Sequence, residues 1–215
     1  PKNIHFDLWL GPAPEQPFHR NFVHYNWHWF WDFGNGDVGN QGIHEMDIAR
    51  WGLCKPLHQE ARPEDVVPVK AASMGGRYGY EDQGQTPNTQ VIQLTYADGR
   101  MLVFEVRGRW TNSEQGQKVG NLFYGSEGFM AGTSPSFGYG GKPYGGKPES
   151  EIKLPEVGGL GADEHHDNFF KAVLSRKVQD LNADILEGHY SAIGFQIGNI
   201  AYRLGRTLTF DPKTE

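Results

Sequence analysis

A tight turn between two β-rich runs constrains this chain more than any other feature of its sequence. TQVIQLTY (residues 89–96) and RMLVFEVRGRW (residues 100–110) flank Ala97-Asp98-Gly99, and Asp-Gly between such runs is typical of a β-hairpin. Because side chains alternate along a strand, one face of the hairpin carries an apolar set: Ile92, Leu94, Tyr96, Leu102, Phe104 and Val106. The fold is therefore expected to contain an antiparallel sheet with one buried face.

Further strands and three helices are expected around this hairpin. NLFYG (residues 121–125), followed by FMAG (residues 129–132), extends the sheet to four or more strands. Helices are expected from an N-cap at Asn40 to about Leu53, over residues 162–176 and over residues 187–206. Their expected apolar residues are Ile43, Met46, Ala49 (or Arg50) and Leu53, then Phe169, Phe170, Val173 and Leu174, then Ile193, Ile197, Ile200, Ala201 and Leu204. Residues 1–33 and 132–150 are interrupted by proline and glycine and are expected to be loops.

The composition fits a folded protein and excludes several classes of function. Hydrophobic residues make up 37% of the 215 residues, which is enough for a packed core. The net charge of -6 argues against nucleic acid as a partner, since nucleic-acid-binding proteins carry a basic patch. No apolar run approaches the ~18 residues of a membrane span. The single cysteine, Cys54, excludes an internal disulfide framework and fits a reducing compartment, so we expect a cytoplasmic protein unless an export signal lies upstream of Pro1.

The stretch Gly34-x-Gly36-x-x-Gly39 matches the fingerprint of a dinucleotide-binding loop, but its surroundings do not. That loop follows a buried strand of small β-branched residues within a strand–helix–strand unit. Here the preceding residues are the bulky WHWFWDF (residues 27–33), and no strand–helix–strand alternation is present. We therefore expect these glycines to allow close approach of the backbone to a neighbouring group rather than to hold a nucleotide.

Several side chains near the glycines have functional interpretations. His44, in the first turn of the expected helix, is either a general acid/base or a structural histidine. The aromatic residues from Trp27 to Trp31 either stack on sugar rings or pack in the core. His165 and His166 open a helix, where they reach a site or cap that helix. The spacing of Asp32 and Asp37 does not indicate the paired carboxylates of a glycosidase.

A metal site is not expected. His19, His24 and His28 lie close together in the sequence, but the segment does not have a helical pattern and lacks Asp or Glu at ligand spacing.

Several stretches together resemble the C-terminal, substrate-binding half of the Gfo/Idh/MocA oxidoreductases, the glucose–fructose oxidoreductase and inositol dehydrogenase family. They are DLWLGPAP (7–14), NWHWFWDFGNGDVGNQGIHEMDIARWGL (26–53), QTPNTQ (85–90), HHDNFFKAV (165–173) and ADILEGHYSAIGFQIGNIAYRLGR (183–206). In that family the counterpart of residues 34–47 reads GGGxLxDxGxHxxD and lies in the substrate domain. The resemblance spans nearly the whole chain.

The resemblance implies roles for particular residues. His44 corresponds to the histidine that shuttles the proton of the oxidised hydroxyl. Asn40 stands where the family has an aspartate, and an amide cannot carry the negative charge that raises the basicity of a histidine. Asn40 is therefore expected to orient His44 or the substrate. The sugar pocket is expected to include Trp27, His28, Asp37 and His165.

The expected protein is an α+β substrate-binding and oligomerisation domain over residues 1–215, with a predominantly antiparallel open sheet covered on one face by helices. The cofactor, NAD or NADP, would be held mainly by the family's N-terminal Rossmann domain, which these residues lack. The expected function is that of the substrate domain of an NAD(P)-dependent sugar or polyol oxidoreductase. A homodimer or homotetramer is expected through the open sheet face, which carries Val91, Met101 and Val103.

Two alternative functions remain. One is a glycoside-cleaving relative that uses tightly bound NAD transiently, and the Asn40 departure keeps this alternative open. The other is a sugar-binding or assembly module without chemistry of its own.

Overall fold

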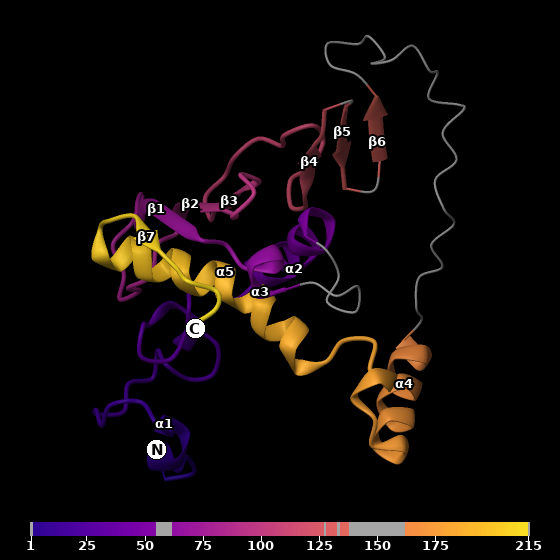
Figure 1. Ribbon diagram of the computed structural model, residues 1–215. Coiled ribbons are helices and arrows are strands. Elements are labelled where there is room, and N and C mark those ends of the chain that lie inside the picture. The colour runs from indigo at the N-terminus through magenta and orange to yellow at the C-terminus, as the bar shows by residue number, and fades with distance from the viewer. Residues whose placement is uncertain (1, 55–61, 127, 133, 138–161, 215) are drawn as a thin grey trace. The chain divides into compact units, whose positions relative to one another are not determined.

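The computed structural model describes residues 2–54, 62–126, 128–132, 134–137 and 162–214. They belong to two compact units (Figure 1). The first unit combines Pro1–Asn112 with Ser191–Glu215, and the second is Ser113–Tyr190.

An open antiparallel sheet forms the centre of the first unit. Its order is β3-β2-β1-β7, where β1 is Lys70–Gly76, β2 is Thr89–Thr95, β3 is Met101–Arg107 and β7 is Leu208–Thr209. Within the hairpin Ile92 pairs with Phe104 and Leu94 with Leu102. The turn at Gly99 is closed by its N–H, which donates to the carbonyl of Tyr96 at 3.0 Å. The hairpin expected from the Asp-Gly signal is confirmed.

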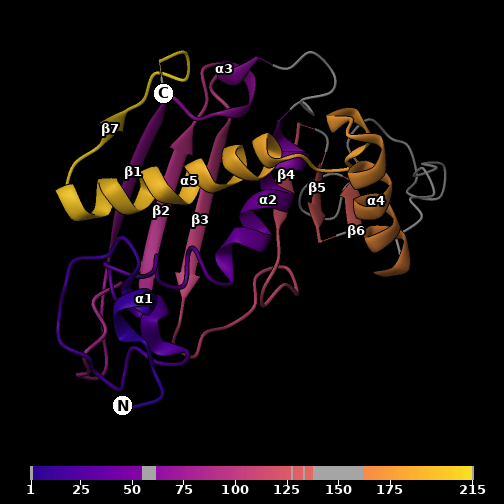
Figure 2. The ribbon, with the colours of Figure 1, turned by 90° about the horizontal axis from the view of Figure 1, so that it is seen from below.

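The long helix α5 (Ile185–Leu204) covers one face of this sheet, and its residues from Ser191 onward belong to the first unit. Figure 2 shows α5 crossing strands β1, β2 and β3. The approach is close: a Cβ added at Gly198 would lie 2.6 Å from Ile92, and one added at Gly194 would lie 3.0 Å from Leu94. Both contacted side chains are fully buried. Small residues on α5 therefore let the helix lie directly on the sheet, as the α+β expectation requires.

The opposite face of the sheet carries exposed apolar side chains. Met74 is 74% exposed, Met101 55% and Val103 50%. The apolar stripe expected on α5 is partly confirmed, because Ile193, Ile197 and Ala201 are buried whereas Ile200 and Leu204 are about half exposed.

The remaining helices of the first unit are α1 (Phe6–Leu10), the 3-10 helix η1 (Asn26–Trp29), α2 (Gly42–Leu53) and α3 (Pro63–Val66). The expectation that residues 1–33 form only loop is therefore wrong at α1 and η1. Asn40 is also not the N-cap of α2. Gln41 occupies that position without a side-chain capping bond, and the Asn40 amide nitrogen donates to the hydroxyl of Tyr25 at 3.4 Å.

The second unit contains a separate three-stranded antiparallel sheet. Its order is β4-β5-β6, with β4 at Leu122–Tyr124, β5 at Gly128–Ala131 and β6 at Ser134–Phe137. NLFYG therefore does not extend the hairpin sheet as expected. It pairs with the strand that follows it, and this strand pairs with β6, inside the expected loop 132–150. Residues 138–150 of that loop lie outside the described residues.

The second unit also contains α4 (Ala162–Ser175), the 3-10 helix η5 (Val178–Asp180) and the first residues of α5. The helix expected over residues 162–176 is confirmed, but the side chains of its expected apolar face are exposed: Phe169, Phe170, Val173 and Leu174. Among the helices in the described part of the chain, none is long and apolar enough to cross a membrane.

Candidate functional site

The aromatic segment that precedes the glycines folds into a compact cluster around Tyr25. The ring of His28 lies 4.6 Å from the Tyr25 ring and stacks on Trp27 at 3.8 Å between centroids. The ring of Trp29 lies 5.6 Å from that of Tyr25. The cluster is half-buried or exposed rather than buried in the core. We refer to Tyr25, Trp27, His28 and Trp29 as the aromatic cluster.

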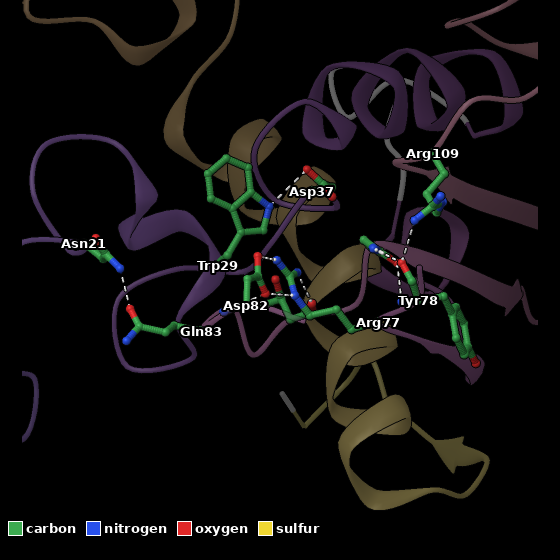
Figure 3. A network of polar contacts seen from close by, with 11 residues as sticks. Asn21, Trp29, Asp37, Arg77, Tyr78, Asp82, Gln83 and Arg109 are labelled. Carbon is green, nitrogen blue, oxygen red and sulfur yellow. Dashed lines mark hydrogen bonds and ion pairs between the residues drawn. The ribbon is translucent and has the colours of Figure 1, made fainter. Parts of the chain in front are cut away.

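Residues 83–86 hold this segment from the other side. The N–H of Gln85 donates to the carbonyl of Trp29 at 2.8 Å, and the side-chain oxygen of Gln85 accepts from the N–H of Trp31 at 2.9 Å. Asn21 donates to the side chain of Gln83 (Figure 3). The QTPNTQ motif therefore anchors the aromatic segment, a role that its sequence alone did not indicate.

The glycines of the fingerprint allow close backbone packing. A Cβ at Gly34 would lie 2.5 Å from the carbonyl oxygen of His28, and this same oxygen accepts the N–H of Gly36 at 2.8 Å. Gly36 has a φ of +72°, and its Cβ would lie 2.7 Å from the Cβ of Thr86. In the described residues the segment before these glycines is η1 and a turn, and the strands pair antiparallel. The geometry agrees with a packing role and lacks the parallel units of a dinucleotide fold.

Asp37 lies next to the aromatic cluster and is half-buried. The indole N–H of Trp29 donates to its Oδ1 at 3.3 Å (Figure 3), and its backbone carbonyl accepts the N–H of Gly42 at 3.0 Å. Burial raises the pKa of Asp37, and the Trp29 N–H and the charges of Arg77 and His28 partly offset this increase. The site therefore contains a carboxylate that is partly removed from water and lies within electrostatic range of His28.

His28 and Asn40 meet at Tyr25. The Nδ1 atom of His28 lies against the carbonyl oxygen of Tyr25, and because a carbonyl only accepts, Nδ1 carries the proton. In a neutral imidazole Nε2 is then the acceptor. The amide nitrogen of Asn40 donates to the Tyr25 hydroxyl at 3.4 Å, which leaves the Asn40 side-chain oxygen to accept from another group. Tyr25 thus fixes the orientation of both candidates.

His44 lies in the first turn of α2, four residues after Asn40, with an exposed side chain. Hydrogen bonds connect α2 to α5. The Nε of Arg50 donates to the hydroxyl of Ser191 at 2.8 Å, this hydroxyl donates to Asp47, and Arg50 is 3% exposed. The position of His44 is therefore defined by a helix that is held near its middle.

The sixth candidate, His165, belongs to a different unit. It lies on α4, and its exposed ring is 5.8 Å from that of His166. The structure connects Trp27, His28, Asp37 and Asn40 through the aromatic cluster, with His44 on the helix that follows. In the described residues no group of three or more His, Cys, Asp or Glu could hold a metal ion.

Sequence reasoning missed two residues of the site. Tyr25 and Arg77 contribute to it, the first through Asn40 and His28 and the second through Asp37. Tyr25 belongs to the aromatic segment, which provided a signal. Arg77 had none, because its approach to Asp37 depends on the packing of the segment after β1.

Comparisons with known proteins place this chain among oxidoreductases. A family model for the C-terminal alpha/beta domain of the oxidoreductase family, of the Gfo/Idh/MocA type, matches residues 1–128. A search of curated proteins gave no match.

Solved structures show the same fold at low identity. The chain is similar to the WlbA dehydrogenase from Chromobacterium violaceum in complex with NADH and UDP-GlcNAcA, with 14% identity, a TM-score of 0.57 and coverage of 91% of this chain and 52% of that chain. It is also similar to the aldose-aldose oxidoreductase from Caulobacter crescentus complexed with glycerol, with 15% identity, a TM-score of 0.55 and coverage of 86% and 51%. The WlbA dehydrogenase from Bordetella pertussis has 14% identity, a TM-score of 0.52 and coverage of 84% and 47%. The chain spans about half the length of these proteins.

Proposed function

Because the chain belongs to the Gfo/Idh/MocA oxidoreductases through their C-terminal alpha/beta domain, we propose that it is the substrate domain of an NAD(P)-dependent sugar or polyol oxidoreductase. The observation that supports this most is the grouping of Asp37, His28 and Asn40 beside aromatic rings. Polar acceptors that lie next to aromatic faces suit a ligand with several hydroxyl groups. Solved structures of the same fold were obtained with glycerol and with UDP-GlcNAcA, which is consistent with such ligands.

Each candidate has a role in this proposal. Oxidation of a carbinol removes a proton from its oxygen and a hydride from its carbon, and His44 accepts that proton. Asn40, where the family has an aspartate, orients the substrate through its side-chain oxygen, since its nitrogen is engaged with Tyr25. Asp37 and His28 accept hydrogen bonds from ring hydroxyls, and Trp27 contributes an aromatic face. His165 keeps its role as a substrate-binding residue in this proposal on the family resemblance alone.

The hydride acceptor in this family is a nicotinamide cofactor. The space beside Gly34 and Gly36 is occupied by His28 and Thr86, so the described residues do not form a dinucleotide loop. We therefore assign the binding of NAD or NADP mainly to a Rossmann domain outside these residues, and we assign only substrate binding and proton transfer to this chain.

The experiment that tests the proposal is the replacement of His44 in the longest protein that contains this chain. His44→Ala is expected to lower turnover by roughly 10²-fold or more, the scale of general acid–base catalysis. Turnover is followed as NADH or NADPH absorbance with a panel of sugars and polyols, and His5→Ala, another exposed histidine of the first unit, is the matched control. A His44→Ala rate equal to that of the control would remove His44 from the mechanism.

One observation favours a second activity, because Asn40 replaces the carboxylate of the family motif. A relative that cleaves glycosides with tightly bound NAD re-forms its cofactor in every cycle, so reducing sugar would accumulate without net NADH. A binding module without chemistry would instead bind sugar and show neither signal when NAD(P) and the rest of the protein are supplied. Parallel assays of NADH and reducing sugar separate these outcomes.

We also propose that the open face of the main sheet is covered by another copy of the chain. Met74, Met101 and Val103 are exposed there, and patches of exposed apolar side chains mark association surfaces. Light scattering at micromolar concentration is expected to give a dimer or tetramer, and Val103→Lys is expected to shift the mass toward the monomer. A wild-type monomer would contradict this assembly.

A further inference from the structure

We infer that the acceptor groups beside the aromatic cluster select uncharged sugars and reject sugar acids, and that Asp37 carries most of this selection. The inference rests on the proposed function, since it names the class of sugar that the same site takes. It goes beyond that function because neither the family nor the fold distinguishes neutral sugars from acidic ones.

The first argument is the balance of acceptors and donors that the site presents. Asp37 Oδ1 accepts the Trp29 indole N–H, while Oδ2, His28 Nε2 and the Asn40 side-chain oxygen form no hydrogen bond with the residues that the structure describes. All three atoms accept hydrogen bonds when the imidazole is neutral. Ligand hydroxyls can donate to them, but a ligand carboxylate cannot.

The second argument is that the neighbouring cation is already engaged. Arg77 forms a two-point ion pair with Asp82, and its Nη1 donates to the carbonyl of Thr86 at 3.0 Å (Figure 3). The N–H groups of the Arg77 guanidinium therefore donate to acceptors within the protein, and Asp82 pairs with its positive charge. A carboxylate that entered beside Asp37 would meet a like charge, which Arg77 offsets only in part because it is already paired with Asp82.

The third argument concerns Arg109, which follows β3 in the chain. Its Nη1 donates to the carbonyl of Tyr78 at 3.1 Å and its guanidinium lies 5.9 Å from the centroid of the Tyr80 ring. These contacts direct Arg109 toward the segment after β1 (Figure 3). Asp37 is partly shielded from water, so its charge acts strongly on a nearby ligand charge.

Paired sugars test this inference directly. D-glucose and D-glucuronate differ only at C6, where a carboxylate replaces the hydroxymethyl group, and D-galactose and D-galacturonate form a second such pair. Binding to the 215-residue chain is measured by NMR titration at pH 8, where histidine side chains are ordinarily neutral, and at low salt. We expect each neutral sugar to bind at least about tenfold more tightly than its acid, since like charges placed together are strongly unfavourable.

Two variants and one change of conditions assign the effect to Asp37. Asp37→Asn keeps an oxygen for the Trp29 N–H and is expected to reduce the preference to about threefold or less, because the negative charge is gone. Asp32→Asn removes an exposed carboxylate of the same segment and is expected to leave the preference unchanged. Raising the salt to 0.5 M is expected to reduce the wild-type preference, which provides a readout that needs no variant.

The outcomes separate this inference from the proposed function. If the chain binds none of the four sugars, the charge selection is overturned, whereas the proposed function is decided by the His44→Ala assay. If it binds neutral and acidic sugars equally, or the acids more tightly, the proposed function stands and the charge selection is wrong. A preference that persists in Asp37→Asn and at 0.5 M salt would also overturn the inference, because its source would not be a charge at residue 37.

Discussion

Replacing Gly36 by alanine tests the packing role of the fingerprint glycines. Gly36 has a φ of +72°, and an added Cβ would lie 2.7 Å from both Cβ and Oγ1 of Thr86. Thr86 is fully buried, so it has little freedom to move away. The substitution therefore combines backbone strain with overpacking. In a loop with open space for a nucleotide beside the glycine, alanine would cause only the backbone strain.

The two costs can be estimated separately. A left-handed backbone costs a residue with a Cβ about 1–2 kcal/mol, and inserting a methyl group into a packed region costs about 1–3 kcal/mol. Gly36→Ala is therefore expected to lower the free energy of unfolding by about 2–5 kcal/mol. Gly205, with a φ of +61° and no atom within 4 Å of an added Cβ, is the matched control. It ends α5 in the left-handed conformation that helix ends often adopt, so Gly205→Ala isolates the strain.

Thermal unfolding followed by tryptophan fluorescence measures the difference. In a chain of this size 1 kcal/mol corresponds to about 2–4 °C, so the melting temperature of Gly36→Ala is expected to lie about 2–12 °C below that of Gly205→Ala. Equal melting temperatures would mean that Thr86 does not resist the added methyl group. The close approach of Gly36 would then not explain why glycine stands at this position.

Other expected outcomes follow from contacts in the first unit. Ser191→Ala is expected to lower the free energy of unfolding in urea by about 1–3 kcal/mol, because Arg50 loses a buried acceptor and Asp47 a donor; a loss no larger than that of the exposed Ser126→Ala would contradict this. Burial raises the pKa of Asp37 above 3.8, so the folded state keeps a proton at pH values where the unfolded chain has released it. The stability of the wild type relative to Asp37→Asn should therefore fall as the pH rises from 3.8 through the raised pKa. A constant stability difference between the two proteins in guanidinium titrations from pH 4 to 7 would refute the shift. Burial also raises the pKa of the Cys54 thiol, so iodoacetamide should modify the folded chain at least about tenfold more slowly than the urea-unfolded chain, and equal rates would show that Cys54 is accessible.

The sequence predicted those parts of the fold that depend on local pattern. The hairpin followed from Asp98-Gly99 and the alternation around it, and α5 followed from its apolar spacing. The separate sheet of the second unit was not predicted, because three short strands that pair only with each other have the same local pattern as strands of one larger sheet. The wrong N-cap has a similar cause. Asn40 has an ordinary capping side chain, but the helix has Gln41 as its N-cap, and local pattern does not fix a helix start to one residue.

The sequence indicated part of the candidate site through its unusual density of aromatic residues. His28 and Asp37 flank that density in the sequence, and the structure places both on the aromatic cluster. The contribution of Arg77 was not predictable, because no pattern links it to Asp37 across about forty intervening positions. The apolar side of α4 illustrates a different limit of sequence-based prediction. Periodicity predicts that the helix has an apolar side, but it does not predict that this side is exposed.

The acceptor atoms that lie beside Tyr25 and Trp29 also determine how the affinity for a ligand depends on the water that it displaces. Asp37 Oδ2 and the Asn40 side-chain oxygen have no hydrogen bond within the described residues, and neither is among the buried atoms without a partner, so water can reach them in the free protein. A sugar hydroxyl that replaces a water molecule there gains little, because one hydrogen bond is exchanged for another. A deoxy sugar at the same position would leave an acceptor desolvated and unpaired, which is far more costly. Such a site binds weakly, yet it discriminates strongly against ligands that lack a hydroxyl group.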